Sequence, residues 1–379
     1  MAYDKVVDSA SLDSKLTQVA DAIRTKGNTS ADLQFPSGFI SAIQAIQTGT
    51  ELQIIVTVTS GATVTATKGS LSVSGTSVNG TCTLTVPEEG DWTVSATLGG
   101  ETSVSNTVNV VSSYDTSLAF ASTILNDNSW EVIRAASDAG QGANLWSVGD
   151  RKAITLNGTV GHLTLSNYTT YAFIIGFNHN ATIEGNNRIH FQLAKTALSG
   201  GIDVAFCDSS CDTTVSKTGY FSMNSTPSSS GGWESSQMRK NICGISLSSY
   251  SGTILAVIPT ALRAVLKSVT KYTNNVGGTT SASAVTATTD YFFLLSEYEA
   301  FGTNSKGNPN EKSKQAQYAY YSAGNSKIKY KYDNTSEGVN WWLRSPSTSA
   351  SFFLLATYID DISANYSYFS AGFAPGFCV

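Results

Sequence analysis

The spacing of apolar residues changes twice along the chain and divides it into three regions. Within residues 1–49 the spacing is helical, in two short stripes on either side of a turn at Pro36 and Gly38. The stripes are Leu12, Leu16, Val19 and Ile23, and then Phe39, Ile43 and Ile46. Helices this short do not fold alone. We therefore expect them to pack against copies of the chain, a larger assembly, or the neighbouring domain.

From about residue 50 to 112 the apolar period changes to two. Apolar and polar residues alternate in three runs, Leu52 to Val58, Cys82 to Val86, and Trp92 to Leu98. Glycines punctuate these runs at short intervals, which is typical of turns between strands. The pattern predicts a small all-β sandwich that resembles the immunoglobulin-like modules of bacterial surface and tail proteins. The resemblance implies spacing or adhesion rather than chemistry.

Residues 113–379 are too long for one such sandwich and give mixed signals. Ser129 is placed to cap a helix through Arg134, and Pro259 stands where a second helix would begin and run towards Val269. Apolar runs that predict strands include Tyr171–Phe177, Tyr291–Leu295 and Phe352–Leu355. Long loops rich in Gly, Ser and Asn join them. We therefore predict a multidomain chain ending in an α+β domain, whose long loops usually serve a site.

The composition is polar without being ionic. Charged residues make up 13% of the chain and hydrophobic residues 41%, while Ser and Thr together number 97. This balance disfavours disorder, which needs low hydrophobicity and high net charge. A net charge of −5 with no basic cluster also argues against nucleic acid as a partner. No apolar run is long enough to insert into a membrane, and Met1 to Lys5 lack the order of a signal peptide.

Five cysteines, Cys82, Cys207, Cys211, Cys243 and Cys378, are spread over the chain. An odd number at these spacings argues against a disulfide framework and fits synthesis in a reducing cytoplasm. Cys207 and Cys211 form the one close pair. A zinc site would need a second pair or nearby histidines, so we predict no bound metal.

No residue pattern typical of a catalytic centre occurs. His162, His179 and His190 stand in no metalloprotease-like motif, and no nucleophile elbow, P-loop or dinucleotide fingerprint is present. We expect His179, which follows an apolar run, to be a hydrogen-bonded structural residue. Glu297 and Glu299 could act as acid and base, yet they would face opposite sides of a strand. We therefore predict neither enzymatic activity nor a cofactor.

The end of the chain has a composition of its own. After the apolar run Trp341–Pro346, the residues from Ser347 to Val379 contain no Lys, Arg, Glu, Gln, Met or Trp. Asparagine codons ending in C, randomised at both adenines, reach Tyr, Phe, Ser, Asp, Ala, Leu, Ile, Thr and Asn but never Lys, Glu, Gln, Met or Trp. The segment thus matches the adenine-directed mutagenesis of diversity-generating retroelements, whose targets are binding proteins. The simpler alternative is an uncharged strand pair that lacks those residue types by accident.

Residues 113–379 resemble the variable proteins of such retroelements in tailed phages and prophages of gut Firmicutes. The motifs that carry the resemblance are Trp146–Asp150, Ile174–Asn180, Gly231–Trp233 with Met238–Arg239, Tyr291–Gly302, Gln315–Tyr321, Trp341–Pro346 and Gly372–Phe377. The resemblance implies a C-type lectin fold related to formylglycine-generating enzyme. Ala20–Arg24 and Phe35–Ile43 similarly resemble the start of Firmicutes phage tail proteins.

The resemblance divides the last segment into scaffold and variable positions. The implied scaffold comprises Trp341, Trp342, Arg344, Phe353, Ser370 and the stretch from Gly372 to Phe377. The implied ligand-contacting, variable positions are Ser349, Ser351, Phe352, Leu355, Thr357, Tyr358, Ile359, Asp361, Ser363, Asn365, Tyr366, Tyr368, Phe369 and Ala371. The family tends to have Gly at Asp360, which puts a turn there in question. Cys378 stands alone where the enzymes have a cysteine pair, so their activity is not carried over.

The variable positions mix rigid aromatic and adaptable polar side chains, as antibody paratopes do. Their only charges are acidic, so anionic ligands are not expected. We therefore expect a receptor-binding protein of a phage tail tip or fibre, made in the bacterial cytoplasm and carried on the virion. Its partners would be a host cell-surface protein or glycan, other tail proteins, and two further copies of itself in a trimer. The alternatives are a structural tail or decoration adhesin without a selected ligand and, last, a formylglycine-generating type of enzyme.

Overall fold

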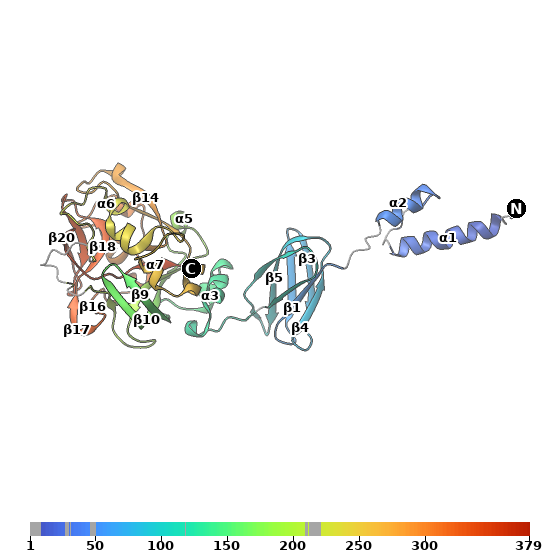
Figure 1. Cartoon of the computed structure of the whole chain (residues 1–379), viewed down its shortest axis with the longest axis horizontal. Coiled ribbons are helices and arrows are strands. Elements are labelled where there is room, and N and C mark those ends of the chain that lie inside the picture. The colour runs from blue at the N-terminus through green and yellow to red at the C-terminus, as the bar shows by residue number, and fades with distance from the viewer. Residues whose placement is uncertain are drawn as a thin grey trace. The chain divides into compact units, whose positions relative to one another are not determined.

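The computed structural model describes residues 9–26, 30, 32–45, 51–117, 119–208, 211 and 221–379. Contacts divide the chain into two compact units, Met1–Val94 with Thr107–Ser117 and Ser95–Asn106 with Leu118–Val379. Strands outnumber the mostly short helices (Figure 1). The prediction of a multidomain, β-rich chain is therefore confirmed. No helix in the described part of the chain is long and apolar enough to cross a membrane.

The N-terminal region forms the two predicted helices, α1 (Ser9–Lys26) and α2 (Ser37–Ala45). Ile23 and Phe39 are buried where the two helices pack together. The other described members of the stripes are less covered: Leu12, Val19 and Ile43 are 46%, 47% and 53% exposed. Ile46 lies outside the described residues. Part of the apolar surface of these helices therefore stays uncovered within one chain.

The alternating region forms two β-sheets. The first runs in the order β4 (Thr81–Thr85), β1 (Gln53–Thr57), β8 (Tyr114–Ser117). The second runs β3 (Leu71–Thr76), β2 (Thr63–Lys68), β5 (Gly90–Leu98), β6 (Glu101–Thr102), with β7 (Asn106–Val110) also paired to β5. Alternate side chains such as Val56 and Val94 are fully buried, as the period of two predicts. Because β8 pairs in parallel with β1, the sandwich extends beyond its predicted end at residue 112.

The C-terminal region is built on a five-stranded sheet. Its order is β15 (Phe292–Phe293), β21 (Gly376–Cys378), β11 (Ile189–Lys195), β10 (Leu163–Phe177), β9 (Arg151–Val160). The strand β21 therefore lies inside the sheet. Phe191 and Phe377 stack with ring centroids 5.2 Å apart in the core beneath it.

Three smaller sheets complete this region. They are β12 (Val204–Ala205) with β16 (Lys329–Lys331) and β17 (Asn334–Val339), β13 (Val269–Asn274) with β14 (Val285–Asp290), and β18 (Trp341–Pro346) with β19 (Phe352–Ala356) and β20 (Ile362–Tyr366). The predicted strands at Tyr171–Phe177 and Phe352–Leu355 are confirmed within β10 and β19. The predicted strand at Tyr291–Leu295 shortens to the two residues of β15.

Short helices connect these sheets. They are α3 (Trp130–Asp138), α4 (Gly142–Leu145), α5 (Ala181–Glu184), α6 (Gly232–Ser235), α7 (Ile254–Val257), α8 (Thr260–Val265), α9 (Glu297–Phe301), α10 (Ala319–Ser322) and the turns η1 (Leu125–Asp127), η2 (Met238–Gly244), η3 (Ala282–Ala284) and η4 (Glu311–Ser313). Ser129 caps α3 as predicted, since its side chain accepts a hydrogen bond from the backbone N–H of Val132. Pro259 precedes α8, but the helix ends at Val265 because Val269 already belongs to β13.

Candidate functional site

The predicted variable positions lie on and around one β-hairpin, β19–β20. The register pairs Phe352 with Tyr366 at one end and Ala356 with Ile362 at the other. On its inner side β19 pairs with β18, so β20 is the edge strand of this sheet. In β19 the residues from Phe353 to Ala356 are buried, whereas Phe352, most of β20 and the turn at the other end of the hairpin reach the surface.

Four aromatic side chains gather at the open end of the hairpin. We call Phe352, Tyr366, Tyr368 and Phe369 the aromatic cluster. The ring of Tyr366 lies 4.5 Å from that of Phe352 and 5.6 Å from those of Tyr368 and Phe369, measured between centroids. Tyr366 is 39% exposed and the other three are partly exposed. The structure thus brings four predicted ligand-contacting residues together at one surface.

The other end of the hairpin carries the most exposed predicted positions. We call Tyr358, Ile359, Asp360 and Asp361 the hairpin tip. Tyr358 and Ile359 are 55% and 67% exposed. The turn that the resemblance put in question at Asp360 does form, with φ of +62° at Asp360 and a hydrogen bond of 2.8 Å from the Thr357 N–H to the Asp361 carbonyl oxygen. Asp tolerates this left-handed conformation better than most residues.

Three predicted ligand-contacting residues are in the interior instead, and their assignment is corrected. Leu355 is 1% exposed because its side chain packs in the hydrophobic core of the region, and Ala371 is fully buried beside Phe221, whose carbonyl oxygen accepts its N–H at 3.1 Å. Thr357, 9% exposed, points its hydroxyl back to accept the N–H of Asp361 at 3.0 Å. The remaining positions, Ser349, Ser351, Ser363, Asp361 and Asn365, are partly or largely exposed.

The predicted scaffold residues are all buried: Trp341, Trp342, Arg344, Phe353, Ser370 and the stretch from Gly372 to Phe377. The indole N–H of Trp341 donates to the Lys327 carbonyl oxygen at 2.8 Å, and that of Trp342 donates to the Phe221 carbonyl oxygen at 2.7 Å. A Cβ on Gly372 would stand 2.8 Å from the Ala205 Cβ. Each anchor is thus fixed by specific contacts, so the hairpin rests on a rigid base.

Two predicted variable residues protect the outer edge of β20. The Asp361 carboxylate accepts the N–H of Ile362 at 2.7 Å, and the Asn365 side chain accepts the N–H of Tyr366 at 2.8 Å. The Lys306 ammonium donates to the Ile362 carbonyl oxygen at 2.6 Å. An edge that is already bonded at Ile362 and at Tyr366 is a poor template for another strand.

A serine-rich loop adjoins the open end of the hairpin. The hydroxyl of buried Ser367 donates to the Thr226 carbonyl oxygen at 2.7 Å and accepts the Ser228 N–H at 2.9 Å. The Ser229 N–H donates to the Ala350 carbonyl oxygen at 2.8 Å. Thr226 and Ser230 remain exposed. The loop therefore adds hydroxyl groups from outside the variable segment. The sequence predicts a long loop here that serves a site, but not its place beside the hairpin.

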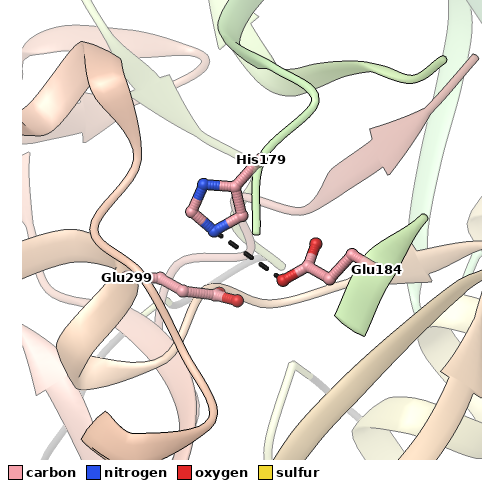
Figure 2. Close-up of side chains that lie close together, drawn as sticks. All are labelled: His179, Glu184 and Glu299. Carbon is pink, nitrogen blue, oxygen red and sulfur yellow. Dashed lines mark ion pairs between the residues drawn. The ribbon is translucent and has the colours of Figure 1, made fainter. Parts of the chain in front are cut away.

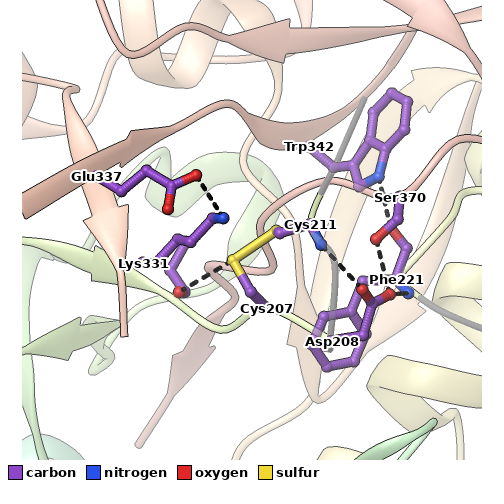
Figure 3. The surroundings of a disulfide bond; sticks show 9 residues. Cys207, Asp208, Cys211, Phe221, Lys331, Glu337, Trp342 and Ser370 are labelled. Atoms are coloured by element: carbon purple, nitrogen blue, oxygen red, sulfur yellow. Dashed lines mark hydrogen bonds and ion pairs between the residues drawn. A yellow bond between two sulfur atoms is a disulfide. The ribbon is translucent and has the colours of Figure 1, made fainter. Parts of the chain in front are cut away.

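A disulfide bond lies close to the scaffold residues Trp342 and Ser370 (Figure 3). Cys207 and Cys211 are bonded with Cα atoms 5.1 Å apart, a bond that the cysteine pattern does not predict, while Cys82, Cys243 and Cys378 are free. The carboxylate of Asp208 accepts the Cys211 N–H at 3.1 Å, which draws the two cysteines together. It also accepts the N–H of Phe221 and the hydroxyl of Ser370, at 2.9 and 2.7 Å. Through these hydrogen bonds Asp208 links the scaffold residue Ser370 to Cys211 and Phe221.

A buried network of charges lies elsewhere in the same region. The ammonium of Lys271 donates to Glu184 at 2.7 Å, to Glu299 at 3.0 Å and to the Tyr318 hydroxyl at 2.8 Å. Arg344 binds Glu299 through two nitrogens, one of them at 2.8 Å. Burial opposes the charged form of Glu299, but Arg344 and then Lys271 outweigh it and hold the pKa of Glu299 well below its usual range. Burial raises the pKa of Glu184 to about 7 despite the opposing effect of Lys271.

Part of this network has the composition of a metal site. The donor atoms of His179, Glu184 and Glu299 lie within 4.8 Å of one another (Figure 2). However, the Lys271 ammonium already bridges both carboxylates, so a divalent ion would have to displace it or add unbalanced charge to the interior. The residues present therefore fit a lysine-centred ion network better than a metal.

His179 is buried and structural, but its predicted hydrogen bonding is not seen at Nε2. That atom has no partner among the described residues and lies 3.7 Å from the Glu184 carboxylate. The imidazole stacks on the Tyr318 ring, with centroids 3.7 Å apart. Burial, followed by the charge of Lys271, lowers the pKa of His179 to about 3, so the ring is neutral at pH 7.

Glu297 and Glu299 do not lie on a strand. They are in α9, whose start is fixed by a capping box between Ser296 and Glu299. The Glu297 carboxylate accepts the N–H groups of Ser305, Lys306 and Gly307, at 2.7 to 3.0 Å. Both side chains are fully buried. Each carboxylate is thus engaged in holding the fold, which gives neither a place beside a substrate.

The comparisons with known proteins are sparse. A family model described as a domain of unknown function (DUF6273) matches residues 214–379. No curated protein and no solved structure matches the chain. The matched segment contains the hairpin, the aromatic cluster and the scaffold, but neither His179 nor Glu184.

Proposed function

We propose that this chain is a receptor-binding protein of a phage tail tip or fibre, whose C-terminal domain has a C-type lectin-like fold and displays a diversified ligand-binding surface. The observation that carries the proposal is the aromatic cluster. Its four rings reach the surface from a hairpin whose base is fully buried, within a segment that contains only residue types reachable by adenine mutagenesis.

The anchoring of the hairpin supports this proposal. A surface that accepts many side chains needs a base whose stability does not depend on them. Here the base consists of buried rings and of Arg344, which binds Glu299, Thr273 and the Leu294 carbonyl oxygen. Exposed positions can therefore change while the contacts beneath them stay the same. Tyrosine and phenylalanine supply contact area at low entropic cost, as in paratopes.

The proposal is tested by removing the aromatic cluster from the full chain. Replacing Tyr366, Tyr368 and Phe369 with alanine should leave the melting temperature within a few degrees of that of the unaltered chain and abolish binding to the bacterial strain that the unaltered chain binds. The matched control is Tyr114→Ala in the sandwich, since Tyr114 and Tyr366 are both 39% exposed. Loss of folding in the triple variant would place those rings in the core and refute the site.

The nucleotide sequence gives a second test. Diversification requires a near-copy of the last hundred or so bases nearby, differing at adenines alone, and a neighbouring reverse transcriptase gene. A structural tail or decoration adhesin without a selected ligand would lack both. It would also give uniformly blank screens of glycans and cell surfaces across many variants.

The enzymatic alternative finds little support at Cys378. This cysteine is fully buried, and burial raises the pKa of its thiol to about 12. A thiol of that kind is a poor nucleophile at neutral pH. Its sulfur lies 3.2 Å from Nδ1 of His190, which is also fully buried. Binding rather than chemistry is therefore the function that these residues support.

A further inference from the structure

We infer that the ligand of this surface is a folded protein that contacts the aromatic cluster and the hairpin tip together, rather than a small saccharide. This inference rests on the proposed function and names the class of receptor. It follows from the spacing of the exposed side chains, the orientation of the rings, the bonded edge of β20 and the charge of the tip.

The spacing comes from the register of the hairpin. Phe352 pairs with Tyr366 at the open end, and Tyr358 lies six residues further along β19 and its turn. At about 3.3 Å per residue the two exposed groups are about 20 Å apart. Between them Leu354, Leu355 and Ala356 are buried. A mono- or disaccharide is too short to touch both groups, whereas a protein surface of ordinary interface size covers both.

The rings of the aromatic cluster do not form a flat platform. Adjacent ring planes are inclined by 39° to 74°. Sugars stack on an open ring face, but these rings cover part of one another's faces and present a compact apolar group with two tyrosine hydroxyls. Such a group fits a concave apolar pocket of the kind that receives aromatic anchors at protein interfaces.

The path between the two groups runs along the edge of β20. Ser363, Ala364 and Asn365 are partly exposed there. Because the N–H groups of Ile362 and Tyr366 are bonded to Asp361 and Asn365, a partner cannot simply add a strand to this edge. Recognition must instead use side chains, which are the part of the hairpin that differs between variants.

Charge distinguishes the tip from the aromatic cluster. Asp360 is paired with Lys327 at 3.5 Å, and Asp361 is exposed beside it. No Lys or Arg occurs from Ser347 onward. Lys327 and Lys306 reach the tip from neighbouring segments, so the complementary partner presents an apolar pocket to the aromatic cluster and polar groups, rather than a strongly basic surface, to the hairpin tip.

The first experiment treats the bound cells. The full chain is tested against strains of gut Firmicutes, and a strain that it binds is then treated with proteinase K or with sodium periodate. Proteinase K should lower binding by about tenfold or more, while periodate should leave it within about twofold. The reverse result would overturn the inference and leave the proposed function intact. If no strain is bound at all, the proposed function fails as well.

The second experiment tests both ends of the surface. Ile359→Ser at the tip and Tyr366→Ala in the aromatic cluster should each lower cell binding by about tenfold without changing the melting temperature. Ile124→Ser is the matched control, since Ile124 is 61% exposed and Ile359 67%. Unchanged binding by Ile359→Ser would show that the tip is outside the contact and would overturn the inference of a two-ended site.

Discussion

At the scale of single residues, two buried lysines show how much depends on partners. Lys271 donates to two carboxylates and a hydroxyl. Lys329 is equally buried, but its ammonium has no hydrogen-bond partner among the described residues and lies 3.9 Å from Asp203. It faces the rings of Phe173 and Trp341 at 5.6 and 5.2 Å. Burial lowers its pKa from 10.5 to about 8.

Lys329→Met should therefore raise the stability of the domain. A buried ammonium without a hydrogen bond is costly even with Asp203 at 3.9 Å, and methionine fills much of the same volume. We expect a gain of about 1–3 kcal/mol at pH 7, measured by chemical or thermal unfolding. Because the pKa of Lys329 is lower in the folded chain, the free-energy cost of burying its ammonium grows as pH falls from 10.5 to about 8 and is constant below that. The gain should accordingly shrink as pH rises from 8 to 10.5.

The control is Lys271→Met, which removes a lysine that has partners. It leaves Glu184 without its cation, so we expect a loss of about 3–5 kcal/mol. If both variants were destabilised alike, the contacts of Lys329 with the two rings would outweigh its missing hydrogen bonds, contrary to the prediction.

The backbone conformation of Asp360 leads to a second prediction about a single residue. Its φ of +62° suits Gly, Asn and Asp but not β-branched residues. Asp360→Val should cost about 1–2 kcal/mol, while Asp360→Asn, which also loses the ion pair with Lys327, should cost under about 1 kcal/mol. Unfolding in denaturant measures both. Equal losses would mean that charge, rather than backbone conformation, decides the turn.

At the scale of elements, the sequence predicts regular patterns well and irregular ones poorly. The alternation Ile54, Val56 and the cap Ser129 each depend on neighbours in sequence, and both are confirmed. The helix α9 was missed because Tyr291–Leu295 and Glu297–Phe301 read as one continuous strand until the capping box of Ser296 separates them. The burial of Glu299 depends on Arg344 and Lys271, which are distant in sequence.

In the candidate site, too, features that depend on local sequence could be predicted, and features that depend on distant contacts could not. The aromatic cluster could be located from the sequence because its composition is distinctive and because the resemblance supplied the positions. The burial of Leu355 could not, since it depends on core residues from distant parts of the sequence that pack against its side chain. The serine-rich loop at Thr226 is predicted as a loop, but its place beside the hairpin is not, because its contact with Ser367 spans 141 residues of sequence.

Gly372 joins the end of the chain to the start of strand β18. Its N–H donates to the Asn340 carbonyl oxygen, its own carbonyl oxygen accepts the Trp342 N–H, and an added Cβ would meet the Ala205 Cβ at 2.8 Å. Gly372→Ala should therefore cost about 1–3 kcal/mol by overpacking. Adding Ala205→Gly should recover part of that loss in unfolding measurements. If the second change recovers no stability, the clash of the added methyl group is with the Asn340 backbone rather than with the Ala205 methyl group.

At the scale of the whole molecule, the exposed apolar residues of the N-terminal helices lead to a prediction about how copies of the chain associate. The described stripe is half covered: Ile23 and Phe39 are buried, whereas Leu12 and Val19 are 46% and 47% exposed on α1. Leu12 and Val19 are seven residues apart and lie on one face of the helix. Apolar residues with this spacing are typical of helices that pack against further helices. Several copies of a weak binding site on one particle would also raise avidity for a host cell.

We expect the full chain to be a trimer and residues 50–379 to be monomeric, as measured by static light scattering. Leu12→Ser with Val19→Ser should dissociate the full chain, because burying two such side chains contributes about 1.5–3 kcal/mol each per copy. Lys15→Ser, at an exposed polar position of the same helix, is the matched control and should leave the trimer intact. If the full chain is monomeric at all concentrations, the exposed stripe instead docks on another tail protein. Adding that protein should then protect α1 from hydrogen exchange.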